Sequence, residues 1–339
     1  MFCNCFFMAE ENFSDIGRVE ALARLYEGTP FHPAENLQFE TGGKASVASA
    51  SRMLLEGIDF NLVYFPLKHL GYKAVIAVTG ELYAALARPR LLSVRLGLSA
   101  KLDLVQVREI WTGIVAAAKE HGYGNVDLDL GPSQNGLSIS VSAVGETAFL
   151  TSKSRPRPQS KDLLCVSGNL GGAFFGLQVL EREMRRFDAD GTQPQLEKYR
   201  MMVGSYLKPE LPAGIVAQLE ETEIFPSSAC LVTRGLADAV KRIARATGLG
   251  AKVYADKIPF EGNSFDLGRE LDIDPVSAAM NGGEDYRLLL AVPILKLEKF
   301  RHDFQTFDII GHLALPEVGT VLVSPDGLEH PLKAQGWKD

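Results

Sequence analysis

The chain has 339 residues, 46% of them hydrophobic, and its 35 basic and 42 acidic residues give a net charge of -7. This length fits two α/β domains of common size. An acidic balance without a basic block argues against a nucleic acid as the main partner, so a small-molecule ligand is expected.

The N-terminal segment and the cysteines bear on location. Residues 1–8 are apolar but lack a basic stretch, and they are too short for a signal peptide or a membrane span, so no membrane association is expected. Met8 is an alternative start. Cys165 and Cys230 lie in apolar runs that predict buried strands, and no two of the four cysteines have metal-ligand spacing. A reduced, cytoplasmic protein is predicted.

The first half of the chain shows alternating helix and strand patterns. A helix is predicted over residues 15–27, and the polar, Gly/Ser/Ala-rich residues 41–51 predict an exposed loop. A strand over 60–64 leads to Pro66 and a helix. Apolar residues at helical spacing over 107–121 predict a second helix, and alternation over 137–144 predicts a half-buried strand.

A stiff charged connector, Arg155-Pro156-Arg157-Pro158, predicts the domain boundary. It divides the chain into an N-terminal domain, residues 1–154, and a C-terminal domain, residues 155–339.

The second half opens with a predicted buried strand over 163–166, a glycine turn over 168–172 and a long helix reaching Arg186. Such a turn can present backbone N–H groups to a phosphate, although tight packing of helix on strand is the favoured interpretation. The remaining pattern predicts the following elements: helices over 196–206, 212–220, 236–247 and 276–280, strands over 252–255 and 287–292, and a hairpin turning at 326–327.

Five segments together resemble the thiamine-monophosphate kinase family of the aminoimidazole-ribonucleotide synthase superfamily. The similarity extends from about residue 13 to residue 337 and rests on these segments: 54–60 (LLEGIDF), 66–73 (PLKHLGYK), 165–171 (CVSGNLG), 282–286 (GGEDY) and 332–337 (LKAQGW). The resemblance implies an α/β (α+β) protein of two domains whose N-terminal domains build a β-barrel between two subunits. It also implies ATP, Mg²⁺ and transfer of the γ-phosphoryl group to thiamine monophosphate.

This chain departs from the family where Mg²⁺ is expected to bind. Mg²⁺ prefers carboxylate oxygens, and family members supply aspartates from several loops. In this alignment Lys44, Arg52 and Arg234 stand where the family has acids. Some ten residues after Lys44 are also missing. Glu81 replaces an aspartate conservatively, and Asp129 is the one unchanged acid of seven, preceded by Leu128 in place of a glycine.

Other positions correspond to substrate and nucleotide contacts in the family. Glu284 and Trp337 match residues that contact the thiamine moiety, whereas Asp59 replaces a histidine and would repel a substrate phosphate. Positions on the nucleotide side fall on Trp111, Arg155 and Thr233. Trp111 lies on an apolar helix face, where a core role is favoured, and Arg155 is equally compatible with phosphate binding and with a solvated linker.

Two hypotheses follow. The leading one is a diverged paralogue with Mg²⁺-dependent transfer weakened or lost, in which Lys44, Arg52 and Arg234 hold a phosphate-bearing molecule without a cofactor. Such a pseudoenzyme would form a homodimer, or act as a regulatory subunit in a heterodimer with an active paralogue. The alternative is an active ATP-dependent kinase whose Mg²⁺ site is rearranged around Glu81 and Asp129, with Asp59 or Asp127 as a further ligand.

Overall fold

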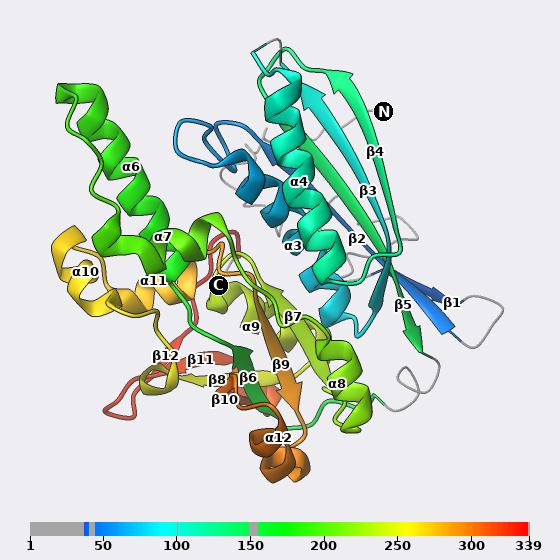
Figure 1. Ribbon diagram of the computed structural model, residues 1–339. Helices are drawn as coiled ribbons and strands as arrows, with labels where there is room; N and C mark the ends of the chain where they lie inside the picture. Colours follow the sequence, from blue (N-terminus) through cyan, green and yellow to red (C-terminus); the bar gives the residue numbers. More distant parts are fainter. Residues whose placement is uncertain (1–36, 41–44, 100, 149–154, 338–339) are drawn as a thin grey trace, which may run out of the picture.

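The strands of this protein form two separate sheets, seen in the computed structural model in Figure 1, which describes residues 37–40, 45–99, 101–148 and 155–337. The first sheet has the order β1-β2-β5-β3-β4, with β1 (Leu37–Glu40), β2 (Ala45–Leu55), β3 (Arg88–Leu98), β4 (Asn125–Pro132) and β5 (Ser138–Ala148). The second has the order β12-β11-β8-β10-β6-β9-β7, with β6 (Leu163–Ser167), β7 (Ser228–Val232), β8 (Gly250–Tyr254), β9 (Arg287–Val292), β10 (Phe307–Ala314), β11 (Thr320–Val323) and β12 (Glu329–Pro331).

Helices accompany both sheets. Two of them, α3 (Leu67–Ala84) and α4 (Leu104–Glu120), follow strands of the first sheet. The second half contributes α6 (Gly172–Asp190), α7 (Arg200–Leu207), α8 (Ile215–Glu221), α9 (Leu236–Thr247), α10 (Ser264–Leu271), α11 (Pro275–Asn281) and α12 (Leu297–Asp303), with short 3₁₀ turns η1 (Glu197–Tyr199), η2 (Ala255–Lys257), η3 (Ile294–Lys296) and η4 (Pro316–Val318).

The first sheet has one covered face and one open face. Strand residues that pair directly point to the same side of a sheet. The row Arg52, Val141, Val94 and Leu128 lies on the covered face, where Val141 and Val94 are fully buried. The neighbouring row Met53, Ser140, Arg95 and Asp129 lies on the open face, where Met53 is 59% exposed.

Helix α3 is buried between the two halves. It packs on β2, β3 and β5 of the first sheet and beside α4, and it also contacts β7, β9 and α7 of the second half. Every residue from Leu70 to Gly80 is buried. A helix that is apolar on all sides is the type expected inside a core rather than on its surface. One hydrophobic core therefore runs through α3 from the first half into the second.

The Gly/Ser/Ala-rich stretch was predicted as a loop, and this prediction is wrong for residues 45–51, which belong to β2. Alanines and serines alternate along it, so that Ala48 lies on the covered face, fully buried, while Ser51 lies on the open face and bonds the Ser142 hydroxyl at 2.9 Å. The alternation with a period of two was present in the sequence, but the alternating side chains were small. Residues 41–44 and the predicted helix at 15–27 lie outside the described residues.

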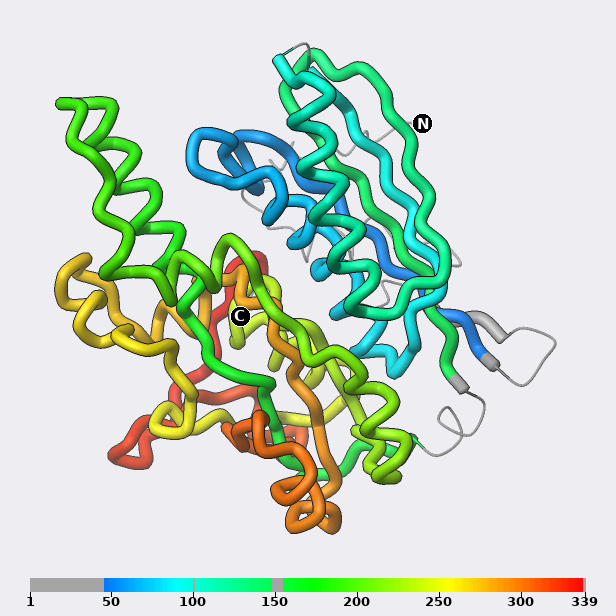
Figure 2. The backbone as a smooth tube through the Cα atoms, in the orientation of Figure 1, coloured from blue at the N-terminus to red at the C-terminus, as the bar shows by residue number. Residues whose placement is uncertain are grey.

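The predicted strand over 60–64 is also wrong, because these residues form a turn. The backbone carbonyl of Asn61 accepts from the backbone N–H groups of Tyr64 and Phe65. The side-chain oxygen of Asn61 accepts from the backbone N–H of Val63 at 3.0 Å. Local asparagine bonding of this kind competes with strand pairing. Figure 2 shows this segment leaving the first sheet and lying beside α6 of the second half.

Most other elements were predicted within a few residues. The strand over 287–292 and the helix over 236–247 have the predicted bounds, and the hairpin at Asp326-Gly327 joins β11 to β12. Sequence reasoning did not predict β1, β3, β4, β10, α10 or α12.

The first sheet is open in the described residues, with β1 and β4 at its edges, so these five strands do not form a closed barrel within one chain. The predicted domain boundary at residue 154 falls between the two sheets and stays a prediction. Among the described residues, no helix is both long and apolar enough to cross a membrane.

Candidate functional site

A group of charged and aromatic side chains meets where α3 contacts the second half of the chain. Lys73 is 2% exposed, and its Nζ donates to Glu284 Oε2 at 2.8 Å and to the Tyr206 carbonyl at 3.0 Å. Burial lowers the pKa of Lys73, and the Glu284 carboxylate opposes this shift. We call the following group the Lys73 cluster: Lys73, Glu284, Phe65, Tyr206, Tyr286, Arg52 and Asp59.

Aromatic rings surround the ammonium group of Lys73. Its Nζ lies 3.8 Å from the ring centroid of Tyr206, 5.3 Å from that of Phe65 and 5.7 Å from that of Tyr286. Ring faces attract cations, more strongly where water is excluded. The ammonium is therefore held by an ion pair, a carbonyl and three rings.

Glu284 belongs to a strained turn, residues 282–286, which we call the Glu284 turn. Gly283 has φ +78°, and the two non-glycine residues Glu284 and Tyr286 have φ +65° and +49°. Left-handed backbone in such residues costs on the order of 1 kcal/mol each. The Glu284 N–H donates to the Thr233 carbonyl at 2.9 Å, which ties the turn to the end of β7.

Asp285, in the same turn, caps helix α6. Its carboxylate accepts from the backbone N–H groups of Gly171 at 3.0 Å and Ala173 at 3.3 Å. Asp285 is fully buried, and burial raises its pKa to about 7 against the opposing effect of these two N–H groups. The glycine turn before α6 therefore presents these N–H groups to Asp285, which favours its packing role over phosphate binding.

Arg52 is the member of the Lys73 cluster that comes from the covered face of the first sheet. Burial works to lower the pKa of Arg52, but the surrounding acidic groups outweigh it and raise the pKa; in order of effect they are Tyr286, Glu284, Glu81 and Asp59. Within the described ranges of the chain, no carboxylate or carbonyl lies within hydrogen-bond or ion-pair distance of this guanidinium. Arg52 thus brings five donors to a group of carboxylates without bonding one of them.

The remaining acidic members of this region are engaged by the protein itself. Asp59 Oδ2 accepts from the Leu55 N–H at 2.8 Å. Glu81 Oε1 lies 3.7 Å from Arg242 Nη2, and Arg242 also lies 3.9 Å from Asp238. Asp238 in turn accepts from the Trp337 indole N–H at 2.8 Å. A chain of charges therefore connects Glu81 on α3 with Trp337 near the C-terminus.

Asp129 lies apart from this region. It is on the open face of the first sheet, and its side chain is 72% exposed. The guanidinium of Arg95 lies 3.8 Å from the Asp129 carboxylate and 2.8 Å from that of Asp127. Glu81 projects from α3, which covers the other face. The two acids predicted to hold a metal therefore lie on opposite sides of the same sheet within one chain.

The described residues of one chain do not fit an Mg²⁺ site. Mg²⁺ needs several hard oxygen ligands in near-octahedral arrangement. No group of three or more histidine, cysteine or acidic residues close enough to hold a metal occurs in the part of the chain that the structure describes. Glu81 and Asp129 each face an arginine, and they cannot share one ion.

Apolar packing fills another position where the family has an acid. Leu231, which in the alignment with the resembled family stands for the first aspartate of an Asp-Ile-Ser-Asp-Gly-Leu motif, lies in β7 and is fully buried. A Cβ added to Gly80 of α3 would lie only 2.4 Å from Leu231 Cδ1. The glycine thus makes room for the leucine, and the two changes fit each other.

The other predicted residues are placed as follows. Thr233 is buried and bonds the Glu284 turn through its carbonyl, and the Arg234 Cα lies 3.4 Å from where a Cβ on Gly283 would be, so both adjoin that turn. Trp111 and Leu128 pack against the core of the first half, and burial lowers the pKa of Arg155. Lys44 lies outside the described residues.

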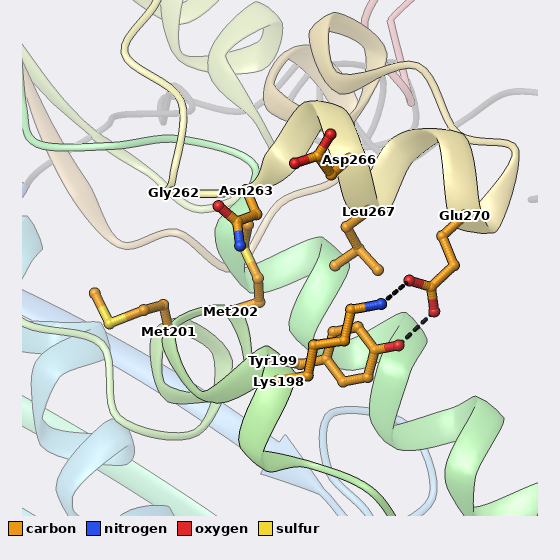
Figure 3. Close-up of a pocket in the computed structure, with 9 residues that line it drawn as sticks. All are labelled: Lys198, Tyr199, Met201, Met202, Gly262, Asn263, Asp266, Leu267 and Glu270. Carbon is orange, nitrogen blue, oxygen red and sulfur yellow. Dashed lines mark hydrogen bonds and ion pairs between the residues drawn. The ribbon is translucent and has the colours of Figure 1, made fainter.

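Two pockets of the described structure lie away from this cluster. One of about 230 Å³ is shown in Figure 3, between α7 and α10, where Lys198 bonds Glu270 at 2.7 Å and the Tyr199 hydroxyl bonds the same carboxylate. These bonds, with Lys198 as the largest contributor, lower the pKa of Glu270 to about 2. Another, of about 200 Å³, is largely apolar and lies between Val63 and α6. Neither contains a residue predicted from the sequence, and the chemistry of the Lys73 cluster is the better guide to function.

Comparisons with known proteins find the following similarities. The model for the family described as AIR synthase related protein, N-terminal domain, matches residues 35–147. The chain is 28% identical to a thiamine-monophosphate kinase of Synechococcus elongatus over 295 residues, 84% of each protein. It is 24% identical to that of Aquifex aeolicus over 291 residues, 84% of this chain and 85% of the relative.

A solved structure has the same fold. The structure of AaThiL complexed with AMPPCP and TMP superposes with a TM-score of 0.77 at 19% identity, and it covers 97% of this chain and 98% of that one. At this identity, the likeness establishes the fold of the chain.

Proposed function

Because this chain belongs to the thiamine-monophosphate kinase family of the aminoimidazole-ribonucleotide synthase superfamily, we propose that it binds a phosphate-bearing small molecule beside the Lys73 cluster. In this proposal its Mg²⁺-dependent phosphoryl transfer is weakened or lost. The protein would act as a binding or regulatory member of the family in the cytoplasm.

The guanidinium of Arg52 carries this proposal. It stands among Glu284, Glu81 and Asp59, and no acceptor from the described residues occupies its donors. Arginine binds phosphate oxygens in a bidentate geometry, and such charge-assisted bonds are stronger than neutral ones. A phosphate would accept from Arg52 where family members are expected to place a metal ion.

Arg234 supports the same location. Its backbone adjoins Gly283, and the next residue of that turn is Glu284, whose carboxylate acts on Arg52. Two of the three acid-to-base changes therefore lie next to one turn. The third, Lys44, lies outside the described residues.

A second candidate function rests on Asp129 and the relatives. The neighbour complexed with AMPPCP and TMP holds an analogue of ATP, which makes ATP a candidate ligand here as well. Asp129 and Asp127 both lie on the open face of the first sheet. A metal site including Asp129 would need acids from another copy of the chain or a paralogue. The alternative is an active ATP-dependent kinase whose site forms between two subunits.

A turnover assay separates the two functions. Purified protein with ATP, thiamine monophosphate and Mg²⁺ is expected to give less than one product molecule per protein, because the described acids of one chain do not fit Mg²⁺. A thiamine-monophosphate kinase of known activity serves as the positive control. Repeated turnover that is abolished by Asp129→Ala would establish the alternative instead.

A further inference from the structure

Lys73 is a buried charge that the proposed phosphate contacts leave unexplained. It comes from the middle of α3, in the first half of the chain, yet both of its hydrogen-bond partners, Glu284 and Tyr206, belong to the second half. A lysine is almost never fully buried unless it is paired. The position of this ammonium therefore depends on its bonds to Glu284 and Tyr206.

Lys73 contacts two residues of the strained Glu284 turn. Glu284 and Tyr286 both have left-handed backbone conformations, and Lys73 contacts the side chains of both, the first through an ion pair at 2.8 Å and the second through its ring. Strained conformations persist only where their surroundings over-determine them. The turn is also held by the bond from Glu284 N–H to the Thr233 carbonyl and by the two bonds that Asp285 accepts at the start of α6.

The ion pair also fixes which part of Glu284 is available. Oε2 is occupied by Lys73, whereas among the described residues Oε1 has only a long contact of 3.5 Å with the Tyr286 hydroxyl. The side chain is 28% exposed. Glu284 is therefore anchored to Lys73 through one carboxylate oxygen, while the other makes a weaker contact in a side chain that is partly exposed.

We propose that Lys73 is the positioning residue of the ligand site: it clamps the Glu284 turn in its strained conformation and aims the free oxygen of Glu284 at a hydrogen-bond donor of the ligand. The ligand class is then a molecule that combines a phosphate, for Arg52, with an amino or hydroxyl group, for Glu284. This inference rests on the proposed function for the identity of the site. The clamp itself can be tested without any ligand.

The first experiment measures amide hydrogen exchange in the ligand-free protein. Lys73→Met replaces the lysine by an apolar side chain of similar length, and it is expected to speed exchange in peptides covering residues 282–287 by about tenfold or more. The matched control is Tyr72→Phe, at the preceding residue of α3. The Tyr72 hydroxyl donates to the Glu120 carboxylate at 3.0 Å and not to a residue of the turn. In the control, exchange over 282–287 should stay unchanged.

The second experiment measures binding of thiamine monophosphate by calorimetry, with Lys73→Met, Glu284→Gln and the double variant. Because Lys73 acts through Glu284, each single variant should weaken binding about tenfold, and the double variant should bind no more weakly than Glu284→Gln alone. A merely structural lysine would instead give losses that add.

The outcomes separate the two proposals. If wild-type protein binds thiamine monophosphate but Lys73→Met binds equally well, the positioning role is overturned. If wild type does not bind this probe, the proposed ligand is wrong and hydrogen exchange alone decides the clamp: unchanged protection of the Glu284 turn in Lys73→Met refutes it. Should Lys73→Met fail to fold, Lys73→Arg keeps the charge, and faster exchange confined to the turn supports the clamp.

Discussion

Asp285 is the single residue whose ionisation should matter most for stability. Its carboxyl is fully buried at the start of α6, and burial raises its pKa from 3.8 to about 7. The folded-state pKa lies above the unfolded value, so the stabilising contribution of the proton is complete below about pH 4 and is lost as the pH rises through 7.

We therefore expect the free energy of unfolding to fall between pH 4 and pH 7, by up to about 4 kcal/mol from this group. Asp285→Asn keeps a neutral side chain with one acceptor and should flatten that slope. Urea unfolding at a series of pH values measures it. The same slope in the Asn variant would show that another group is responsible.

Arg52 is the residue whose removal should weaken anion binding. With inorganic pyrophosphate as the probe, Arg52→Ala is expected to raise the dissociation constant about tenfold or more, since charge-assisted bonds are lost. The loss should be equal in EDTA and in Mg²⁺, because in the proposal the guanidinium replaces the metal. Arg90→Ala is the control, as Arg90 is exposed and paired with Glu146. Wild-type affinity that rises strongly with Mg²⁺ would contradict the prediction.

Some of these residues could be found from the sequence and others could not. Arg52 and Arg234 were recognisable because a motif places them where acids are expected. Lys73 was missed, although a lysine between Tyr72 and Ala74 in an apolar helix is a visible signal of a buried, paired cation. The separation of Glu81 from Asp129 was not predictable, since it depends on which face of the sheet each residue reaches.

At the scale of elements, the contact of α3 with β7 depends on the pair Gly80 and Leu231. Gly80→Ser, which adds a Cβ 2.4 Å from Leu231 Cδ1, should destabilise the protein by about 1–3 kcal/mol through overpacking. Leu231→Ala, combined with it, should restore part of that loss, because the added side chain then enters the vacated space. Denaturant unfolding of the two single variants and the double variant measures the coupling. Strictly additive losses would mean that the two residues do not share this space.

Elements with long apolar periodicity were predictable, whereas those with small residues or local side-chain bonding were not. Helix α9 has apolar residues at helical spacing and strand β9 is a continuous apolar run, and both were predicted with their bounds. β2 begins with alanines and serines, which gave little contrast between its faces. At Asn61 the side chain forms a turn within a stretch whose composition favours a strand.

At the scale of the whole molecule, the open face of the first sheet is the expected contact between subunits. It carries the serines of β2 and β5, such as Ser51 and Ser142, which are only partly covered. We expect a dimer through this face, and Ser142→Arg should convert it to a monomer, because an unpaired charge would be buried. Light scattering after gel filtration measures the mass. Glu317→Arg, at an exposed position in η4, should leave it unchanged, and a dimer that survives Ser142→Arg would exclude this face.

Helix α3 has a consequence for how the chain can fold. Both hydrogen-bond partners that the described residues offer to Lys73 belong to the second half, and the helix is buried from Leu70 to Gly80 by both halves together. A fragment ending before residue 155 would expose one side of this helix to water and leave its partners behind. The two sheets are thus not independent cooperative units, and unfolding should proceed as a single transition in spite of the two-sheet architecture.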